Sequence, residues 1–146
     1  MVSDSQSRGY VVKAGASRGP VVPQPGRFLA TSEDTQGAFM VVEAAGGAIG
    51  ASALHVHHDH DEAMYIIEGN VVATIGDVEH QLGPGDFAFL PKGIPHRLDF
   101  RTEAKWILIG SGGYDASRGR IFGAFSEGRT GAEAYAVLDD VDFVSE

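Results

Sequence analysis

The sequence lacks cysteine, is poor in basic residues and contains no long apolar run. Without cysteine there is no disulfide, no thiol nucleophile and no thiolate ligand for a metal. Only 11 lysines and arginines stand against 20 aspartates and glutamates, which gives a formal net charge of −9. Nucleic acids and anionic membranes are bound mainly through clustered basic side chains, and the sequence has no such cluster. We therefore expect a small-molecule partner, with no nucleic acid and no membrane.

The length of the chain and its first residues further limit the class of protein. A chain of 146 residues is expected to form a single domain with a substantial core. Residues 1–8 are polar and lack the apolar segment of a secretion signal, and no later run approaches the length of a membrane-spanning helix. Together with the missing cysteine, this leads us to expect a cytoplasmic protein.

Glycine is abundant, with 20 residues, and it recurs between short apolar runs. Gly69-Asn70 and Gly76-Asp77 each separate two such runs, as in the two-residue turns of tight β-hairpins. Many short strands without a convincing long helix indicate a closed or double-sheet β architecture. The predicted strands, besides one that carries His55 and His57, are 28–31, 38–44, 64–68, 71–75, 78–82, 87–90, 96–100 and 105–109.

Both ends of the chain are less regular. Val11-Val12 and Val21-Val22 could form edge strands, and the nearby prolines exclude a helix there. Near the other end we expect a short helix around 131–137. Val141 and Phe143 alternate with acidic residues, which is typical of an edge strand added to this sheet or to a partner.

Histidines concentrate between residues 55 and 60. His55 and His57 are two positions apart, so on an extended strand both imidazoles project from the same face. Glu62 opens the next apolar run, and a strand that folds back after the polar loop 58–61 could bring its carboxylate to the same point. Two imidazoles and a carboxylate suit a divalent transition metal.

A fourth candidate ligand lies further along the chain. A turn at Pro91 to Gly93 reverses an apolar strand, and His96 heads the strand that follows. Three imidazoles and one carboxylate would hold a divalent ion and leave positions for water, dioxygen or substrate. His55, His57, Glu62 and His96 are therefore predicted to bind one divalent transition metal per chain, with Fe, Mn, Ni, Co and Zn all left open.

These two segments resemble the two sequence motifs of the cupin superfamily. The first motif is matched by His55, His57, Glu62 and Gly69, with Gly50 one residue closer to the first histidine than is usual. The second motif is matched by residues Gly85, Pro91, Gly93 and His96, with Phe100 in place of the family's asparagine. That asparagine is not a metal ligand in the family, so the departure leaves the predicted metal site intact.

The resemblance implies an all-β fold, the jelly-roll β-barrel of the cupins, in a single domain. We expect an N-terminal arm with edge strands at 1–30, the cupin barrel at 31–112, and a C-terminal extension at 113–146 that packs on or pairs with the barrel. Cupins of this kind are often dimers, and the edge segments near the N-terminus could pair across such an interface. The resemblance therefore also favours a homodimer.

The remaining three histidines are not part of the predicted ligand set. His58 and His60 are interpreted as solvated loop residues, with a ligand role for His60 as the alternative. His80 is expected to be exposed and without a role.

Side chains two positions apart on a strand share a face, so residues at this spacing from the predicted ligands should form the wall of a largely apolar pocket. Arg97 and Lys105 should face outward, which leaves few cationic groups for an acidic substrate and favours an aromatic or polyketide-like ligand over a sugar phosphate. The predicted pocket residues are Met64, Ile66, Leu98, Phe100, Trp106 and, on neighbouring strands, Phe87 or Phe89 and Phe39 or Val41.

Three functions are compatible with this site. The leading hypothesis, from resemblance to small bacterial cupins related to quercetinase-type dioxygenases, is a metal-dependent dioxygenase acting on a small apolar or aromatic oxygenated substrate, with Glu62 also serving as the catalytic base. The first alternative is a polyketide cyclase or isomerase that uses Zn as a Lewis acid without redox chemistry. The second is a cupin that binds metal or ligand without turnover.

Overall fold

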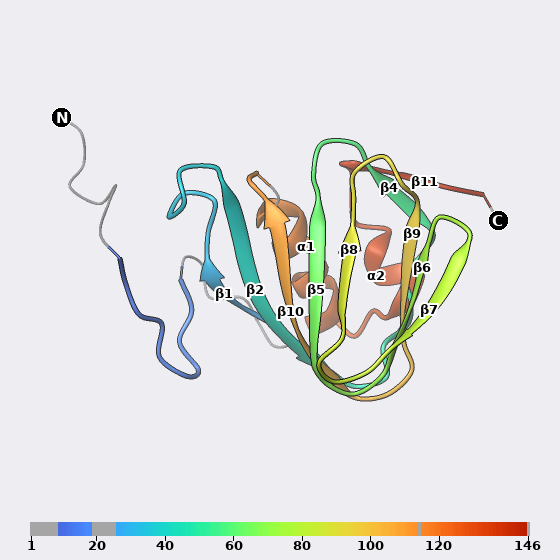
Figure 1. Cartoon of the computed structure of the whole chain (residues 1–146), viewed down its shortest axis with the longest axis horizontal. Helices are drawn as coiled ribbons and strands as arrows, with labels where there is room; N and C mark the ends of the chain where they lie inside the picture. Colours follow the sequence, from blue (N-terminus) through green and yellow to red (C-terminus); the bar gives the residue numbers. More distant parts are fainter. Residues whose placement is uncertain (1–8, 19–25, 114, 146) are drawn as a thin grey trace.

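The computed structural model describes residues 9–18, 26–113 and 115–145, and it is built on two antiparallel β-sheets that face each other (Figure 1). The first sheet has five strands in the order β1-β2-β10-β5-β8. Their bounds are Gly26–Ala30 for β1, Phe39–Gly46 for β2, Ala104–Ser111 for β10, Glu62–Glu68 for β5 and Phe87–Leu90 for β8.

The second sheet has six strands and carries the histidine motif. Its order is β11-β4-β9-β6-β7, and β3 pairs with β9 beside this path. The bounds are Val141–Phe143 for β11, His55–His57 for β4, His96–Phe100 for β9, Val71–Ile75 for β6, Val78–Leu82 for β7 and Gly50–Ala51 for β3. The predicted all-β, double-sheet architecture is confirmed.

The hairpin turns explain why the central strands could be located from sequence. Gly69 and Gly76 have φ angles of 86° and 62°, which a two-residue turn requires and which glycine adopts without strain. The strands predicted at 71–75, 78–82, 87–90 and 96–100 are confirmed with the same bounds. The predicted β11 is also confirmed, and it pairs with β4.

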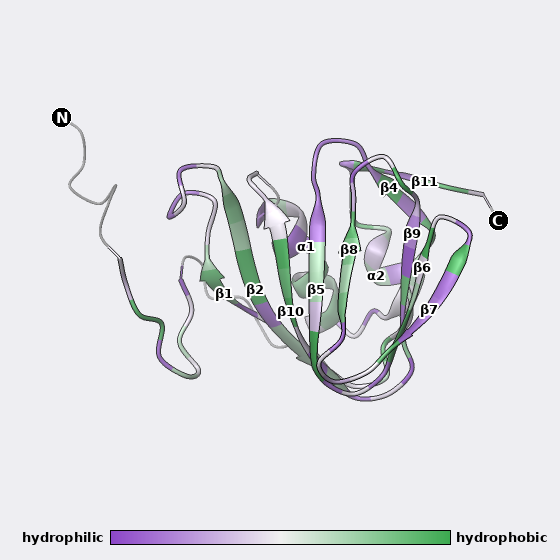
Figure 2. Cartoon of the chain, in the orientation of Figure 1, coloured by the Kyte–Doolittle hydropathy of each residue, from purple (hydrophilic) through white to green (hydrophobic). Residues whose placement is uncertain are grey.

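Alternating side chains build the core between the two sheets. In Figure 2 hydrophobic and hydrophilic residues alternate along several strands, as expected where one face is buried. Met40 and Val42 of β2 are fully buried, whereas Phe39 is 43% exposed and Val41 is only partly buried. Phe39 and Val41 therefore face away from the core, and their predicted place in a pocket wall is wrong.

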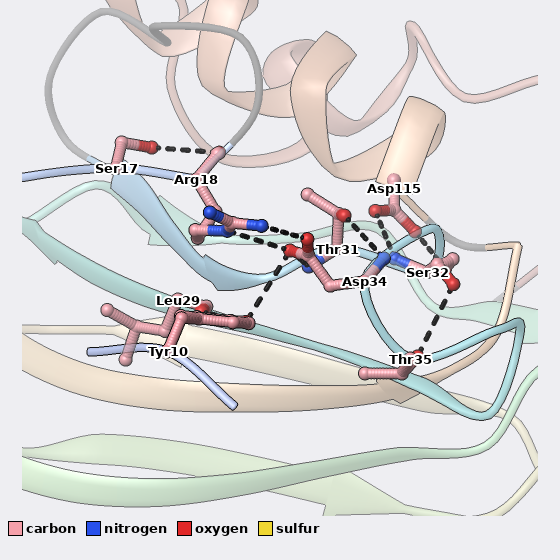
Figure 3. Close-up of polar contacts among 9 residues, drawn as sticks. All are labelled: Tyr10, Ser17, Arg18, Leu29, Thr31, Ser32, Asp34, Thr35 and Asp115. Atoms are coloured by element: carbon pink, nitrogen blue, oxygen red, sulfur yellow. Dashed lines mark hydrogen bonds and ion pairs between the residues drawn. The ribbon is translucent and has the colours of Figure 1, made fainter. Parts of the chain in front are cut away.

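The edge strand expected at Val11-Val12 does not form. Val11 is 79% exposed, and the segment 9–18 is tied to the barrel mainly by side chains. The Tyr10 hydroxyl donates to the Leu29 carbonyl, and the Arg18 guanidinium binds Asp34 (Figure 3). Side-chain contacts and one backbone hydrogen bond, from the Arg18 N–H to the Phe28 carbonyl, hold the segment here without a strand. The second expected strand, at 21–22, lies outside the described residues.

Two helices follow the last strand of the first sheet. The predicted short helix is present as α2, Gly131–Tyr135, while a longer helix, α1, Asp115–Ser126, was not predicted. The buried face of α1 includes Ser117 and Arg118 beside Ile121 and Phe122, so its sequence lacks a regular apolar stripe. Among the described residues, no helix is long and apolar enough to cross a membrane.

The first turn of α1 is anchored to the loop between β1 and β2. The Asp115 carboxylate accepts the Ser32 backbone N–H at 2.9 Å and also contacts the Ser32 hydroxyl (Figure 3). Further along α1, Phe122 joins the main core and meets Phe28 edge to face, with 6.4 Å between ring centroids. These contacts fix the helix against the barrel and so determine where its Arg118 side chain lies.

Candidate functional site

Three buried histidines of the second sheet form the centre of the site. His55 and His57 lie on β4, and His96 lies directly opposite His55 in the β4–β9 pair. One nitrogen from each ring lies within 4.8 Å of one from each of the others, and all three residues are 1% exposed. The i, i+2 spacing therefore brings the His55 and His57 rings together, as predicted. The pairing of β4 with β9 adds the His96 ring.

The surroundings of His55 and His57 favour the neutral imidazole, which is the form that binds a metal. The His55 Nδ1 atom lies 2.7 Å from the Ala53 carbonyl oxygen, which can only accept, so Nδ1 carries the proton and the Nε2 lone pair is available. Burial lowers the pKa of His55 to about 3 and that of His57 to about 4. Both rings are consequently neutral at physiological pH, the form that binds a metal.

Glu62 brings a carboxylate to the histidines from the opposite sheet. Its Oε2 atom lies 3.1 Å from His96 Nε2 and 3.5 Å from His57 Nε2, and the residue is 2% exposed. Glu62 follows directly on the loop 58–61, which is fixed by Asp61: its Oδ1 accepts the Lys92 N–H and its N–H donates to the Ser111 hydroxyl. These bonds set the point at which β5 begins and hence where the carboxylate lies.

Arg118 of α1 reaches the same carboxylate and was missed from sequence. Its Nη2 atom lies 2.6 Å from Glu62 Oε1, and the residue is only 5% exposed. Burial alone raises the pKa of Glu62, but the adjacent His96 ring and the Arg118 guanidinium outweigh this and hold that pKa well below its usual value. Glu62 is therefore ionised at neutral pH.

Tyr135 of α2 closes the site on the side of His55. The two ring centroids are 5.4 Å apart, and Tyr135 is 4% exposed. Burial raises the pKa of its phenol, while the nearby Arg118 guanidinium acts in the opposite direction. No motif pointed to Tyr135 or Arg118, because both come from the extension after β10, where the sequence pattern is mixed.

This donor set fits a divalent transition metal. Three imidazoles whose nitrogens converge in a buried position, with an ionised carboxylate beside two of them, supply the ligand types that such ions prefer. The cluster of His55, His57 and His96 could thus bind one metal ion.

The other three histidines lie outside this cluster. His58 is exposed, as expected, and its Nε2 atom lies 2.7 Å from Asp142 Oδ2. His60 is half-buried, so the expectation that it is solvated is only partly met. His80 on β7 is exposed, as expected.

The predicted pocket residues divide into two groups. Met64, Ile66, Leu98, Phe100 and Trp106 are each no more than 4% exposed and belong to the core between the sheets. Phe87 and Phe89 of β8 are 59% and 53% exposed, and their assignment to the pocket wall is wrong. Alternation on this short strand turns Ala88 and Leu90 inward instead, opposite the face that was expected.

Comparison with known proteins identifies the barrel. A family model for the cupin domain matches residues 39–110. Quercetin 2,3-dioxygenase from Bacillus subtilis (strain 168) is 34% identical over 93 residues, which cover 62% of this chain and 28% of that protein. The chain therefore spans less than a third of the length of this relative.

Solved structures agree on the fold. An RmlC-like cupin from Shewanella frigidimarina NCIMB 400 superposes with a TM-score of 0.61 at 18% identity, over 77% of this chain and 97% of that one. KdgF from Halomonas sp. superposes with a TM-score of 0.55 at 20% identity, over 62% and 80%. The matching family model and the two sequence motifs show that residues 39–110 of this chain form a cupin domain, and these barrels agree with it in fold.

Proposed function

We propose that this cupin is a metal-dependent dioxygenase that acts on a small, apolar or aromatic oxygenated substrate, in the manner of a quercetinase. The observation that carries the proposal is the convergence of three buried imidazoles and one ionised carboxylate on a single point. The identity of 34% with a quercetin 2,3-dioxygenase supports the choice of reaction, over the part of that enzyme that aligns.

In this proposal His55, His57, Glu62 and His96 hold one divalent ion. Such an ion would supply Lewis acidity and, in the case of Fe, Mn, Ni or Co, the one-electron chemistry that dioxygen requires. The Ala53 carbonyl keeps His55 in the tautomer that binds through Nε2.

Glu62 has a second role as the general base. Its Oε2 atom is the carboxylate oxygen beside the histidines, so it would accept the proton from an acidic hydroxyl of a substrate bound there and leave the substrate oxygen negatively charged. Before a substrate binds, the Oε1 atom is held by Arg118, which fixes the orientation of the carboxylate. The buried apolar residues of the core, among them Phe100 and Trp106, would keep water away from the charged oxygen.

Oxygen uptake with a panel of flavonols and related phenols tests this function. We expect uptake with at least one of them by the wild type, and a loss of at least about 100-fold in Glu62→Gln, because removal of a general base typically costs this much. His80→Ala, on the exposed face of β7, serves as the control and should keep the wild-type rate. A metal-loaded wild type that consumes no oxygen with any of these compounds would contradict the dioxygenase proposal.

The same donor set is also suited to Zn, which has no redox chemistry. A zinc-loaded protein without oxygen uptake would therefore favour a cyclase or isomerase, and ligand binding without turnover would favour a binding protein. A cytoplasmic location and a homodimer are also part of the proposal.

A further inference from the structure

We propose that Arg118 makes this site selective for an oxyanionic substrate, a carboxylate or an acidic enol or phenol, by exchanging the Glu62 carboxylate for an oxygen of that ligand. The inference rests on the proposed function in one respect, because it takes the histidine cluster to hold a divalent ion. It goes further in naming the charge of the substrate and the residue that recognises it. It also corrects the expectation, drawn from Arg97 and Lys105, that few cationic groups are available to an acidic ligand.

The Arg118 guanidinium is buried beside the Glu62 carboxylate. Arg118 is 5% exposed, and its Nη2 atom is 2.6 Å from Glu62 Oε1, while Glu62 Oε2 faces His57 and His96. A single carboxylate thus separates the guanidinium from the candidate metal position. A ligand oxygen that took the place of Glu62 Oε1 would face the Arg118 guanidinium at hydrogen-bond distance.

Helix α1 holds the Arg118 side chain in a fixed place. Asp115 binds Ser32 in the β1–β2 loop, and Phe122 packs into the barrel core, so α1 is held on both sides of Arg118. The guanidinium is planar, permanently charged and presents several donors in a fixed fork that matches carboxylate oxygens. Such a group, fixed in a buried position, favours an oxyanion over a neutral ligand.

With a divalent ion bound, the site would carry an excess of positive charge. Metal-binding imidazoles are neutral, so the charged groups would be a divalent ion with two positive charges, Arg118 with one, and Glu62 with one negative charge. This leaves two positive charges in excess in a buried environment, where unbalanced charge is costly. An anionic ligand reduces the excess, and a neutral one does not.

Helix α1 also supplies a matched control for the test. Arg120 lies two positions after Arg118, but its Nη2 atom pairs with Asp139 Oδ1 at 2.8 Å and its side chain is 38% exposed. A substitution of Arg120 removes the same charge from the same helix without touching the Glu62 carboxylate.

The test is calorimetric titration of the cobalt-loaded protein with benzoate and with its neutral counterpart benzamide. We expect the wild type to bind benzoate in preference to benzamide, and Arg118→Gln to lose about tenfold or more in benzoate affinity, the range expected for a charged hydrogen bond. Arg120→Gln should bind benzoate like the wild type. The proposal is overturned if Arg118→Gln keeps the wild-type affinity for benzoate, or if the wild type does not distinguish the two compounds.

A metal-free experiment separates this proposal from the proposed function. In Glu62→Ala the space of the carboxylate is vacated, and acetate should raise the melting temperature more than chloride at equal ionic strength, by pairing with Arg118. The double variant Glu62→Ala/Arg118→Gln should show no such difference, and an equal acetate effect in both variants would overturn the role of Arg118. If instead the wild type bound no cobalt while acetate still acted through Arg118, the metal-dependent function would fail and the anion selectivity would stand.

Discussion

His57 and His96 stack with 5.4 Å between their ring centroids and an angle of 20° between their planes, each within reach of Glu62. Each ring reaches this position from a different strand, so neither can replace the other as a donor. We predict that His57→Ala and His96→Ala each lower the affinity for Co²⁺ or Zn²⁺ by at least about tenfold, since either change removes one ligand from the site. Metal titration of the purified variants measures this.

His80→Ala is the matched control for these two variants. His80 is exposed on β7 and lies outside the histidine cluster, so its loss should leave metal affinity unchanged. Equal affinity in all three variants would show that the cluster is not the binding site.

At the scale of single residues, the histidine cluster could be predicted because each of its members sits in a local pattern. His55 and His57 share a strand face through their spacing, and His96 follows a turn marked by Pro91 and Gly93. Arg118 has no such pattern around it. Its approach to Glu62 depends on the packing of α1 against the barrel, which no short stretch of sequence encodes.

The bounds of strand β8 were predicted correctly, but the face that turns toward the core was not. The sequence Phe87-Ala88-Phe89-Leu90 is apolar throughout, so hydrophobicity could not tell the inner from the outer face. Pairing with β5 decides the question, because Leu90 lies opposite Glu62, whose side chain points inward. The smaller Ala88 therefore faces the core and the two phenylalanines face outward.

This orientation of β8 gives a direct prediction for stability. Leu90→Ala should lower the free energy of unfolding by about 2–5 kcal/mol, because Leu90 is 1% exposed and its loss leaves a cavity. Phe89→Ala, at a position 53% exposed, should change it by only about 0.5 kcal/mol. Urea unfolding of both variants would reveal the opposite ranking if Phe89 faced the core.

For the molecule as a whole, acidic side chains dominate the charge, and one of them ties the N-terminal segment to the barrel. The hydrogen bond from Arg18 lowers the pKa of Asp34 far below its usual value, against the opposing effect of burial, and the Thr31 N–H adds to this effect (Figure 3). A carboxyl with a depressed pKa in the folded protein stabilises it above the pKa of the unfolded chain, about 4, and loses this contribution as the pH falls further. The Asp34 contribution to stability should accordingly be present at pH 7 and diminish toward pH 2.

Asp34→Asn isolates this contribution. At pH 7 we expect it to lower the free energy of unfolding by about 1 kcal/mol, a modest effect because solvent screens a partly exposed ion pair. The difference from the wild type should shrink as the pH falls from 5 to 2, as measured by urea unfolding at each pH. A difference that stayed constant over this range would contradict the role of the ionised carboxylate.

For the whole molecule, the β-barrel could be predicted from the sequence, whereas the packing of the helices over the histidine cluster could not. The two-residue turns at Gly69 and Gly76 and the spacing of the short strands are by themselves typical of a double-sheet fold. The covering of the site by α1 and α2 depends on contacts between distant parts of the chain, such as the Arg118–Glu62 ion pair and the ring contact of Tyr135 with His55. Sequence patterns of a few residues carry no information on such contacts.

The central claim is that the cluster of three histidines and Glu62 holds one divalent ion. Elemental mass spectrometry of the protein purified without a polyhistidine tag tests it most directly. We predict close to one divalent transition-metal ion per chain, whether Fe, Mn, Ni, Co or Zn, and its loss in His57→Ala and His96→Ala. Protein that contains no metal, and takes none up when Fe²⁺, Mn²⁺, Ni²⁺, Co²⁺ or Zn²⁺ is supplied, would contradict it.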